Sequence, residues 1–500
     1  MHSNDIVMKA YGITKEFPGV IALDSVNLNV QKGTVHCIIG ENGAGKSTLV
    51  KILTGLYIPN AGTLDIGGRS IQKNRSAFEL VSYVPQEIDL FQDLSVAENL
   101  FMPFFKCGMK GAFISKKVLY EKSKKYLNRF QIPVNPEDSV KNISISNQQL
   151  LQIARAATRE HFKVLILDEP TTSLTNKETK VLFHVIKELK ASGIAIIFIS
   201  HKLDEIFDIG DYVTVLRNGK LAGESPIIDT TKKWIISKMS GEEIDIDEIF
   251  RPKTKPGHLV LQVDNLSGDC FNDISFSLHK GEVLGFSGLI GAGRTELMQT
   301  IFGYRKKNKG RINYLNCKWK GKTHKSVKNG MVYIPEERKQ QGILPTLSVR
   351  DNIGISNFSD TSKYYFISNK KEELLVNSVI EDFDVKTSTL DKKIIYLSGG
   401  NQQKAIIGRA TKSNPDLLIF DEPTKGIDVK TKVEIHRLIK KLAEENQIAI
   451  ILISSEMDEI FKCSSRIITL YQGEITGRFN TEQTNKTQIL SAMIGAGEKE

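Results

Sequence analysis

The chain has 500 residues, which gives room for two to four domains that each bury a hydrophobic core. It is 40% hydrophobic and 25% charged, and its longest apolar runs, such as Ile194–Ile199, are far too short to cross a bilayer. The net charge of +10 is compatible with nucleic-acid binding. The lysines, however, are interspersed with acids across the chain, so we favour a solvated surface, with anionic lipid headgroups as one candidate neighbour.

The N-terminal residues lack the charged start and apolar run of a signal peptide. Five cysteines are scattered along the chain and never occur in CxxC spacing, which favours a reducing compartment without structural zinc or disulfides. We therefore expect a cytoplasmic chain.

The first half alternates short apolar strands with amphipathic helices, which predicts an α/β fold with a mainly parallel sheet. Thr34–Ile39 reads as a buried strand that feeds a glycine-rich loop, and Ser47–Leu53 reads as the helix that leaves it. Val164–Leu167 and Ile194–Ile199 are wholly apolar, as expected for strands covered on both faces. A charged helical segment, roughly 115–130, lies between the first of these strands and the later two.

The second half repeats this scheme, with strands expected at Val283–Ser287, Leu417–Phe420 and Ile448–Ile453 and a charged helical segment at roughly 372–383. GLIGAGRT at 288–295 echoes GENGAGKS at 40–47, and four further motifs recur in the same order with offsets of 248 to 254 residues. Two homologous domains therefore lie in tandem. We place the first domain at 1–245, a breaker-rich linker at 246–258 and the second domain at 259–500.

The loop GxxxxGKS between a strand and a helix predicts a phosphate-binding site, because its backbone N–H groups and the helix N-terminus converge on phosphate oxygens. Lys46 can reach the β- and γ-phosphates, and the Ser47 hydroxyl can bind magnesium. The expected nucleotide-binding residues in this segment are Gly40, Glu41, Asn42, Gly43, Ala44, Gly45, Lys46, Ser47 and Thr48.

Two acids and a histidine follow apolar strands. Asp168 is placed to hold magnesium, and Glu169 to orient and deprotonate water, whereas the alternative is that both merely end a strand. His201 is more often a satisfied core residue when taken alone, but after these motifs a γ-phosphate contact is favoured. Phe17 is expected to stack on adenine, with core packing as the alternative.

With these residues assembled, the chain resembles the ATP-binding-cassette family, and more narrowly the double-cassette ATPase subunit of bacterial monosaccharide importers of the ribose/galactose/xylose type. The resemblance rests on the Walker loop, LSGGNQQK at 397–404, GLIGAGRTEL, PEERK and EPTKGIDV, and it covers nearly the whole chain. It implies two ABC-type P-loop domains, each with a helical subdomain. It also assigns Gln86 to catalysis and to the magnesium shell.

The resemblance implies that each ATP lies between the Walker loop of one cassette and the signature segment of the other. The first site would combine Lys46 and its partners with Ser398, Gly399 and Gly400. The second would combine Arg294, Thr295, Glu336, Asp421, Glu422 and Ser455 with Ser144, Ile145 and Ser146. Because arginine, glutamate and serine replace lysine, glutamine and histidine there, we expect this site to bind nucleotide but to hydrolyse it poorly.

The family implies an ATPase that uses ATP and Mg²⁺ to energise the import of a ribose-type monosaccharide. Its expected partners are a pair of integral-membrane permease chains and a separate sugar-binding protein, with no nucleic acid. The expected location is the cytoplasmic face of the cell membrane, peripherally bound. The same machine importing nucleosides or a signalling sugar is the alternative, and a soluble tandem cassette protein acting on ribosomes is a remote one.

Overall fold

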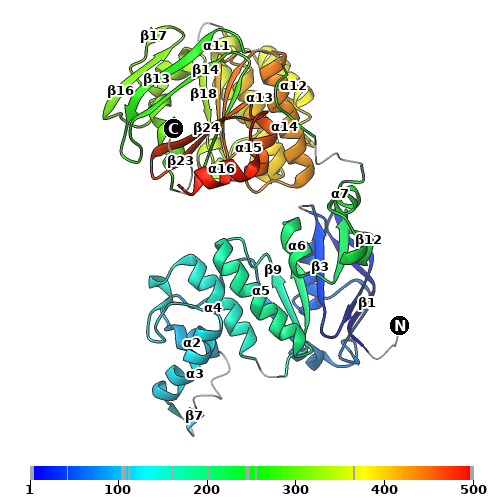
Figure 1. The fold of residues 1–500 in the computed structure, drawn as a ribbon. Coiled ribbons are helices and arrows are strands. Elements are labelled where there is room, and N and C mark those ends of the chain that lie inside the picture. The colour runs from blue at the N-terminus through cyan, green and yellow to red at the C-terminus, as the bar shows by residue number, and fades with distance from the viewer. Residues whose placement is uncertain are drawn as a thin grey trace. The chain divides into compact units, whose positions relative to one another are not determined.

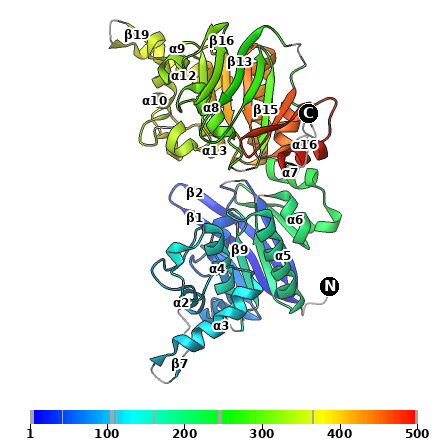
Figure 2. The same cartoon turned by 60° about the vertical axis from the view of Figure 1, so that its left-hand side comes forward.

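The computed structural model divides the chain into two units, Met1–Ile244 and Asp245–Glu500, whose elements are labelled in Figure 1 and Figure 2. It describes residues 5–41, 43–102, 109–110, 113–159, 161–200, 202–242, 248–253, 256–289, 291–363 and 366–495. In that part of the chain no helix is both long enough and apolar enough to span a membrane.

A six-stranded sheet forms the core of the first unit, in the order β12-β11-β3-β10-β9-β6. Its strands are β3 (Val35–Gly40), β6 (Val81–Val84), β9 (Val164–Asp168), β10 (Ala195–Ile199), β11 (Tyr212–Arg217) and β12 (Lys220–Pro226). All neighbours pair in parallel except β11 and β12. Every residue of β3, β9 and β10 is buried, because both faces of the sheet are covered.

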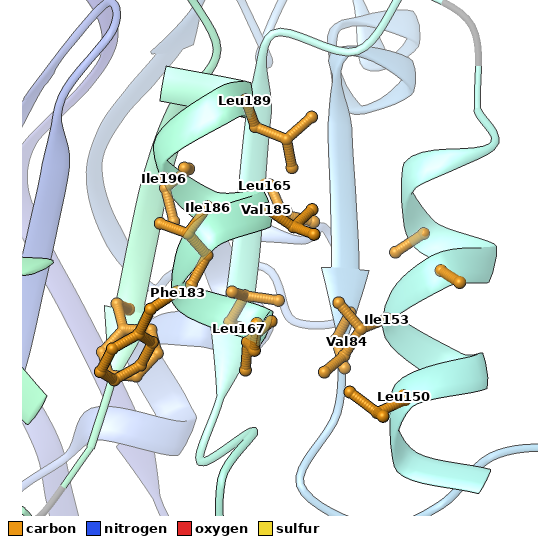
Figure 3. Packing of buried hydrophobic residues seen from close by; sticks show 14 of the residues in the cluster. Val84, Leu150, Ile153, Leu165, Leu167, Phe183, Val185, Ile186, Leu189 and Ile196 are labelled. Carbon is orange, nitrogen blue, oxygen red and sulfur yellow. The ribbon is translucent and has the colours of Figure 1, made fainter. Parts of the chain in front are cut away.

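Helices of the first unit cover this sheet from both sides. They are α1 (Lys46–Leu53), α2 (Val96–Phe101), α3 (Lys116–Arg129), α4 (Ile145–Ala157), α5 (Asn176–Ala191), α6 (Leu203–Ile209) and α7 (Lys232–Ser240). On one face, Phe183 and Ile186 of α5 pack on Leu167 and its strand neighbours, and Ile153 of α4 packs on Val84 (Figure 3). On the other face, α1 packs with a second sheet.

This second sheet is antiparallel, with the order β2-β1-β4-β5. It comprises β1 (Ile6–Phe17), β2 (Val20–Gln31), β4 (Ala61–Ile66) and β5 (Arg69–Ser70), and a short hairpin, β7 (Met109–Lys110) and β8 (Phe113–Ile114), lies elsewhere in the unit. The sequence reading missed the antiparallel sheet. Register shifts interrupt the β1–β2 ladder at several places, which blurs the strict alternation that marks a half-buried strand.

The second unit repeats the architecture, with a six-stranded sheet in the order β18-β21-β22-β15-β23-β24 and a four-stranded antiparallel sheet in the order β14-β13-β16-β17. The strands are β13 (Leu259–Ser267), β14 (Ile274–His279), β15 (Val283–Gly288), β16 (Lys309–Tyr314), β17 (Cys317–Lys318), β18 (Met331–Ile334), β19 (Ser362–Lys363), β20 (Phe366–Ile367), β21 (Leu417–Asp421), β22 (Ala449–Ile453), β23 (Arg466–Tyr471) and β24 (Glu474–Asn480). The helices are α8 (Arg294–Phe302), α9 (Thr323–Lys328), α10 (Val349–Gly354), α11 (Phe358–Thr361), α12 (Asn369–Asp382), α13 (Gly399–Thr411), α14 (Val429–Glu444), α15 (Met457–Cys463) and α16 (Lys486–Met493).

Two α/β units, each with a mainly parallel core sheet and a set of helices beside it, confirm the predicted fold class. The strands inferred from apolar runs agree with β3, β9, β10, β15, β21 and β22 to within a residue or so. These six strands could be predicted from the sequence because burial on both faces makes them mostly apolar.

Residues 248–253 pack on the second unit. The Phe250 ring lies 5.2 Å from the His436 ring, and the Phe250 amide donates to the Lys462 carbonyl. Glu248 pairs with Arg437 at 2.6 Å. This part of the segment between the predicted domains is therefore held by the unit that follows it.

Candidate functional site

A glycine-rich loop joins β3 to α1 in the first unit. Gly45 precedes the first residue of α1 with a φ of 100°, and a Cβ there would lie 2.7 Å from the Ala22 carbonyl oxygen, so only glycine fits. The turn leaves the N-terminus of α1 facing the loop, where its unpaired N–H groups favour an anion. Of the predicted loop residues, Asn42 lies outside the described residues.

Lys46 folds back over this loop. Its Nζ donates to the Gly40 carbonyl at 2.6 Å and to the Glu41 carbonyl at 3.0 Å. Burial lowers the pKa of Lys46, and the carboxylates of Glu169 and Asp168 oppose that shift. The lysine is therefore a partly desolvated cation close to two acids and able to reach a phosphate bound in the loop.

The acid pair follows β9, at the carboxyl edge of the sheet. Asp168 is 7% exposed, and its pKa is raised by burial first and by Glu169 second, while Lys46 lowers it. Glu169 has a φ of 47°, an uncommon conformation for a side chain other than glycine, and its Oε2 accepts from Gln86 Nε2 at 3.0 Å. Backbone strain of this kind concentrates at functional sites.

These residues fit a magnesium ion. The Ser47 hydroxyl and the Asp168 carboxylate offer the oxygen ligands that Mg²⁺ prefers, and within the described chain the Ser47 hydroxyl makes no hydrogen bond. No three histidine, cysteine or acidic side chains gather among the described residues into a cage that could hold a metal unaided. A cation here would therefore need other oxygen ligands, such as those of a phosphate.

Two of the predicted contacts are less well defined. His201 lies outside the described residues. Phe17 ends β1 and is 38% exposed, and its ring meets the edge of Tyr57 at 5.7 Å, with Lys15 Nζ 5.4 Å from its centroid. It is a surface residue, so simple core packing does not explain it.

The segment predicted as the signature lies in the second unit, at the start of α13. Ser398 caps the helix by accepting from the Asn401 amide. A Cβ on Gly400 would lie 2.4 Å from Thr431 Cγ2, so this glycine is required by packing within its own unit. Arg338 opens a π-helical turn, Arg338–Gly342, and its Nε donates to Gln402 Oε1 at 3.2 Å, behind the signature.

The corresponding segment of the first unit starts α4. Ser144 caps it, and Ile145 is 64% exposed. Ser146, which stands where Gly400 stands in the second unit, helps to lower the pKa of Glu178, the counterpart of Thr431. In each unit, this residue of the signature segment thus lies beside a side chain of the following helix, Glu178 in the first unit and Thr431 in the second.

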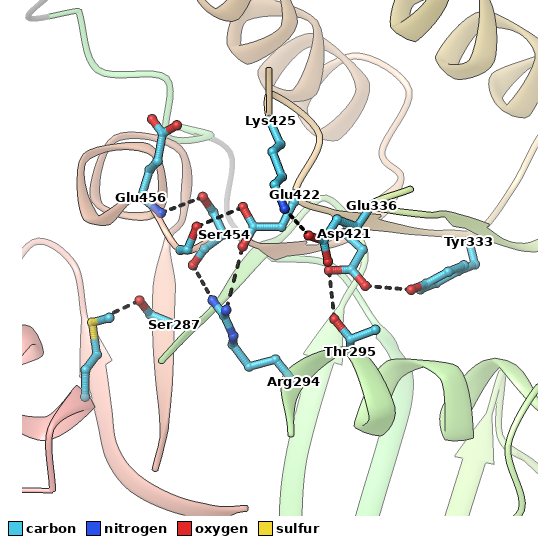
Figure 4. A network of polar contacts seen from close by, with 12 residues as sticks. Ser287, Arg294, Thr295, Tyr333, Glu336, Asp421, Glu422, Lys425, Ser454 and Glu456 are labelled. Carbon is cyan, nitrogen blue, oxygen red and sulfur yellow. Dashed lines mark hydrogen bonds and ion pairs between the residues drawn. The ribbon is translucent and has the colours of Figure 1, made fainter. Parts of the chain in front are cut away.

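In the second unit the counterpart of Lys46 is bound differently (Figure 4). Arg294 is 8% exposed; its Nη1 donates to the Ser454 carbonyl at 2.7 Å and its Nη2 lies 3.7 Å from Glu422 Oε1. Ser455 Oγ donates to the other oxygen of Glu422 at 3.3 Å. The arginine is therefore directed to the end of β22 and to the acid, whereas Lys46 bonds the carbonyls of its own loop.

The second acid pair is largely satisfied by its neighbours. Asp421 is fully buried and accepts from Thr295 Oγ1 at 3.2 Å and from the Tyr333 hydroxyl at 2.6 Å, one on each oxygen. Glu336 pairs with Lys425 at 2.5 Å. A cation here would have to compete with Thr295 and Tyr333 for Asp421, whereas Asp168 accepts a longer bond, 3.5 Å, from the Tyr83 hydroxyl. These residues therefore fit magnesium less well than Ser47 and Asp168.

Burial raises the pKa of Glu422 to about 7, although Arg294 opposes this shift. Glu422 has a φ of 49°, close to that of Glu169, and its amide donates to the Ile453 carbonyl as the Glu169 amide does to Ile199. The strained backbone of the acid pair is thus kept in both units.

The structure brings Lys46, Gln86, Asp168 and Glu169 together in the first unit, and Arg294, Thr295, Glu336, Asp421, Glu422 and Ser455 in the second. Sequence reasoning missed the tyrosines on the aspartates and the roles of Lys425 and Ser454. The tyrosines could have been found, because YVPQ and YIPE carry Tyr83 and Tyr333 at matching positions. Nothing in the sequence indicates that the Ser454 backbone accepts from Arg294.

The family model for the ABC transporter matches residues 23–172 and 271–425. The chain is 40% identical, over 99% of its own length and 98% of the other, to a putative ribose/galactose/methyl galactoside import ATP-binding protein of Geobacillus kaustophilus. It is 41% identical, over 98% and 96%, to the galactose/methyl galactoside import ATP-binding protein MglA of Clostridium perfringens.

Among solved structures, the complex of archaeal ribosomal stalk protein aP1 and archaeal ribosome recycling factor aABCE1 matches with a TM-score of 0.62 and 19% identity. The match covers 96% of this chain and 92% of the other, and at this identity it shows a shared fold only. Each matched segment of the family model contains one of the two glycine loops and the acid pair that follows it. The chain therefore belongs to the ABC transporter family.

Proposed function

We propose that the chain hydrolyses ATP to energise the import of a ribose- or galactose-type monosaccharide through a membrane permease. The observation that carries this proposal is the identity of about two residues in five, over nearly the whole length, to two relatives named as sugar import ATP-binding proteins. The site of the first unit supports it, because a lysine, a glutamine and two acids surround the glycine loop.

We propose a role for each residue of that site. Lys46 and the loop residues 40–48 bind the phosphates, and Glu169, oriented by Gln86, accepts a proton from the attacking water. Ser47 and Asp168, with Gln86, would hold Mg²⁺, which neutralises phosphate charge when bound. His201 is assigned to the γ-phosphate and Phe17 to the adenine.

Ser398, Gly399 and Gly400 are proposed to contact the nucleotide bound at the first loop. The second loop, with Arg294 and Thr295, is proposed to bind nucleotide without efficient hydrolysis. Support for this inequality comes from the bonds that already engage Arg294, Thr295 and Asp421 within their unit. A glutamate held by arginine and serine is a poorly placed base.

The proposed partners are a pair of integral-membrane permease chains and a separate sugar-binding protein, with the ATPase bound peripherally at the cytoplasmic face. Nucleic acid is not among them, and the fold likeness to a ribosome recycling factor at 19% identity does not argue for one. Import of nucleosides or of a signalling sugar by the same machine is the alternative.

Uptake in a strain that lacks the chain tests this function. Labelled galactose, ribose, xylose and uridine would be offered to cells complemented with the wild-type chain or with Lys46→Ala. We expect the wild type to restore uptake of a monosaccharide and Lys46→Ala to fail at equal expression. Restored uptake of uridine alone would support the nucleoside alternative, and no effect on any of the four would contradict the proposal.

A further inference from the structure

Positive charge is concentrated in one stretch of the second unit. Residues 297–335 contain no aspartate or glutamate and ten lysines and arginines, so the expectation of evenly mixed charges fails here. Because the chain as a whole has a net charge of +10, the remaining residues are electrically balanced. We call these ten the basic surface: Arg305, Lys306, Lys307, Lys309, Arg311, Lys318, Lys320, Lys322, Lys325 and Lys328.

All ten side chains are exposed, and five of them, Arg305, Lys306, Lys307, Lys320 and Lys322, line a hollow. The hollow has a volume of about 500 Å³ and is lined by residues from the end of α8, from β16, from the loop after β17 and from the start of α9. Lys306, Lys320 and Lys322 line it, together with the buried face of Trp319. Tyr304, also at the hollow, is 71% exposed.

The cations of the basic surface lack acidic partners. Among the described residues none of them forms an ion pair; Arg305 bonds the Gln299 amide oxygen and Lys307 bonds the Gly310 carbonyl. Like charges held this close repel one another, which destabilises the unit unless an anion offsets them. The basic surface is therefore suited to binding an anionic ligand.

The basic surface is separate from the nucleotide loop of its own unit. Arg294 begins α8 and the hollow lies at the other end of this helix of nine residues, roughly 13 Å away along the axis. α9 leads directly into β18, the edge strand of the core sheet, whose far end continues to Glu336. From the family resemblance we expect the segment after Glu336, residues 337–353, to contact the permease.

The corresponding stretch of the first unit carries no such cluster of cations. This stretch, residues 49–85, carries four lysines and arginines and two acids, and the loop after α1 reads Leu56, Tyr57, Ile58 and Pro59 where the second unit has Tyr304, Arg305, Lys306 and Lys307. Leu56 and Ile58 are exposed by 63% and 62%. The basic surface is therefore not part of the machinery common to both units.

We propose that the basic surface binds the anionic phospholipid headgroups of the membrane at which the subunit works. Lysines clustered on a surface attract such headgroups by roughly 1 kcal/mol each, and the hollow can admit a headgroup phosphate among three of them. An exposed tyrosine beside lysines suits the headgroup layer, where amphipathic rings collect. This inference goes beyond the ATPase proposal, since it requires neither nucleotide nor sugar.

Sedimentation with vesicles tests this inference on the full-length chain. Vesicles of phosphatidylcholine alone and of phosphatidylcholine mixed with phosphatidylglycerol would be compared at low and high salt, without nucleotide or permease. The test variant is the triple Lys306→Gln, Lys320→Gln, Lys322→Gln. The matched control removes three exposed lysines of α3, Lys117→Gln, Lys122→Gln and Lys125→Gln, none of which forms an ion pair among the described residues.

We expect the wild type and the control to bind the phosphatidylglycerol vesicles at low salt, and the test variant to bind on the order of 100-fold more weakly. Soluble glycerol phosphate should not compete at concentrations that match the lipid, because one headgroup offers too little charge. Equal losses in both triples, binding to neutral vesicles, or equally tight binding of an oligonucleotide through the same lysines would each overturn the proposal. ATPase activity serves as the folding check, so a failed lipid result leaves the ATPase proposal standing.

Discussion

In the first unit Lys46 donates to two carbonyls of its own loop, whereas in the second unit Arg294 donates to the Ser454 carbonyl and approaches Glu422. The backbone of the acid pair is nearly the same in both, with φ values of 47° and 49° at the glutamates. What differs is whether the side chains around the loop are already engaged by one another. A fold can thus keep the strained geometry of a catalytic acid after the surrounding contacts have been redirected.

The largest expected difference between the units is in the rate of ATP hydrolysis. Glu169→Gln should lower kcat of the assembled transporter by roughly 10²–10⁴, the usual effect of removing a general base. Glu422→Gln should leave most of the activity, because Arg294 and Ser455 hold Glu422 away from such a role. Steady-state phosphate release measures both, and equal losses would contradict the inequality of the two sites.

The raised pKa of Glu422 predicts a pH dependence of stability that is specific to the second unit. Since burial raises this pKa from 4.5 to about 7, ionising the carboxyl as the pH rises opposes folding. Between about pH 5 and pH 8 the free energy of unfolding should fall by up to about 3 kcal/mol more in the wild type than in Glu422→Gln.

The fluorescence of Trp319, in a Trp234→Phe background, reports on unfolding of the second unit, because the chain has only these two tryptophans. Glu445→Gln removes an exposed acid of the same unit and should keep the pH slope of the wild type. A wild type and a Glu422→Gln variant with the same slope would show that the carboxyl is not shifted.

Gly400 is placed to separate packing from nucleotide contact. Gly400→Ala should destabilise the second unit by about 1–3 kcal/mol, because its Cβ would lie 2.4 Å from Thr431 Cγ2. Adding Thr431→Ser removes that methyl group and should restore part of the stability, as measured by urea unfolding. We expect ATPase activity to stay low in the double variant; recovery of activity together with stability would assign Gly400 to packing alone.

The smallest expected effect is that of a single charge. Gln86→Glu copies Glu336 into the first site, where no lysine matches Lys425 and the new carboxylate would face Glu169. kcat should fall by about tenfold, and Thr172→Lys, which supplies the counterpart of Lys425, should recover part of it. Gln86→Ala is the control for loss of the hydrogen bond, and an identical effect of alanine and glutamate would exclude the charge as the cause.

Much of the fold could be predicted because buried parallel strands are uniformly apolar and because the motifs recur in both halves. For this reason the strands at Ile194–Ile199 and Val164–Leu167 could be predicted from the sequence. The antiparallel sheets were not, since bulges break their alternation. Gly400 illustrates the limit at the site: its sequence motif suggests a phosphate contact, but only coordinates reveal Thr431 against it.

The hydrogen bond and ion pair of Arg294 could not be predicted from the sequence, for a different reason. An arginine side chain has several rotatable bonds and can reach a phosphate, a carboxylate or a backbone carbonyl from one position. Which partner it binds depends on the path of the chain after β22. Every residue has a backbone carbonyl, so the sequence does not indicate that the carbonyl of Ser454 is the acceptor.

The contacts of residues 248–253 determine where this polypeptide could be divided into two separately produced proteins. A cut placed by composition alone, within the proline-rich run at 252–256, would strip Phe250 from His436 and Glu248 from Arg437. The second half would then lack the ring that packs on His436 of α14 and the ion pair to Arg437. A gene split that leaves Glu248 and everything after it on the downstream partner keeps these contacts.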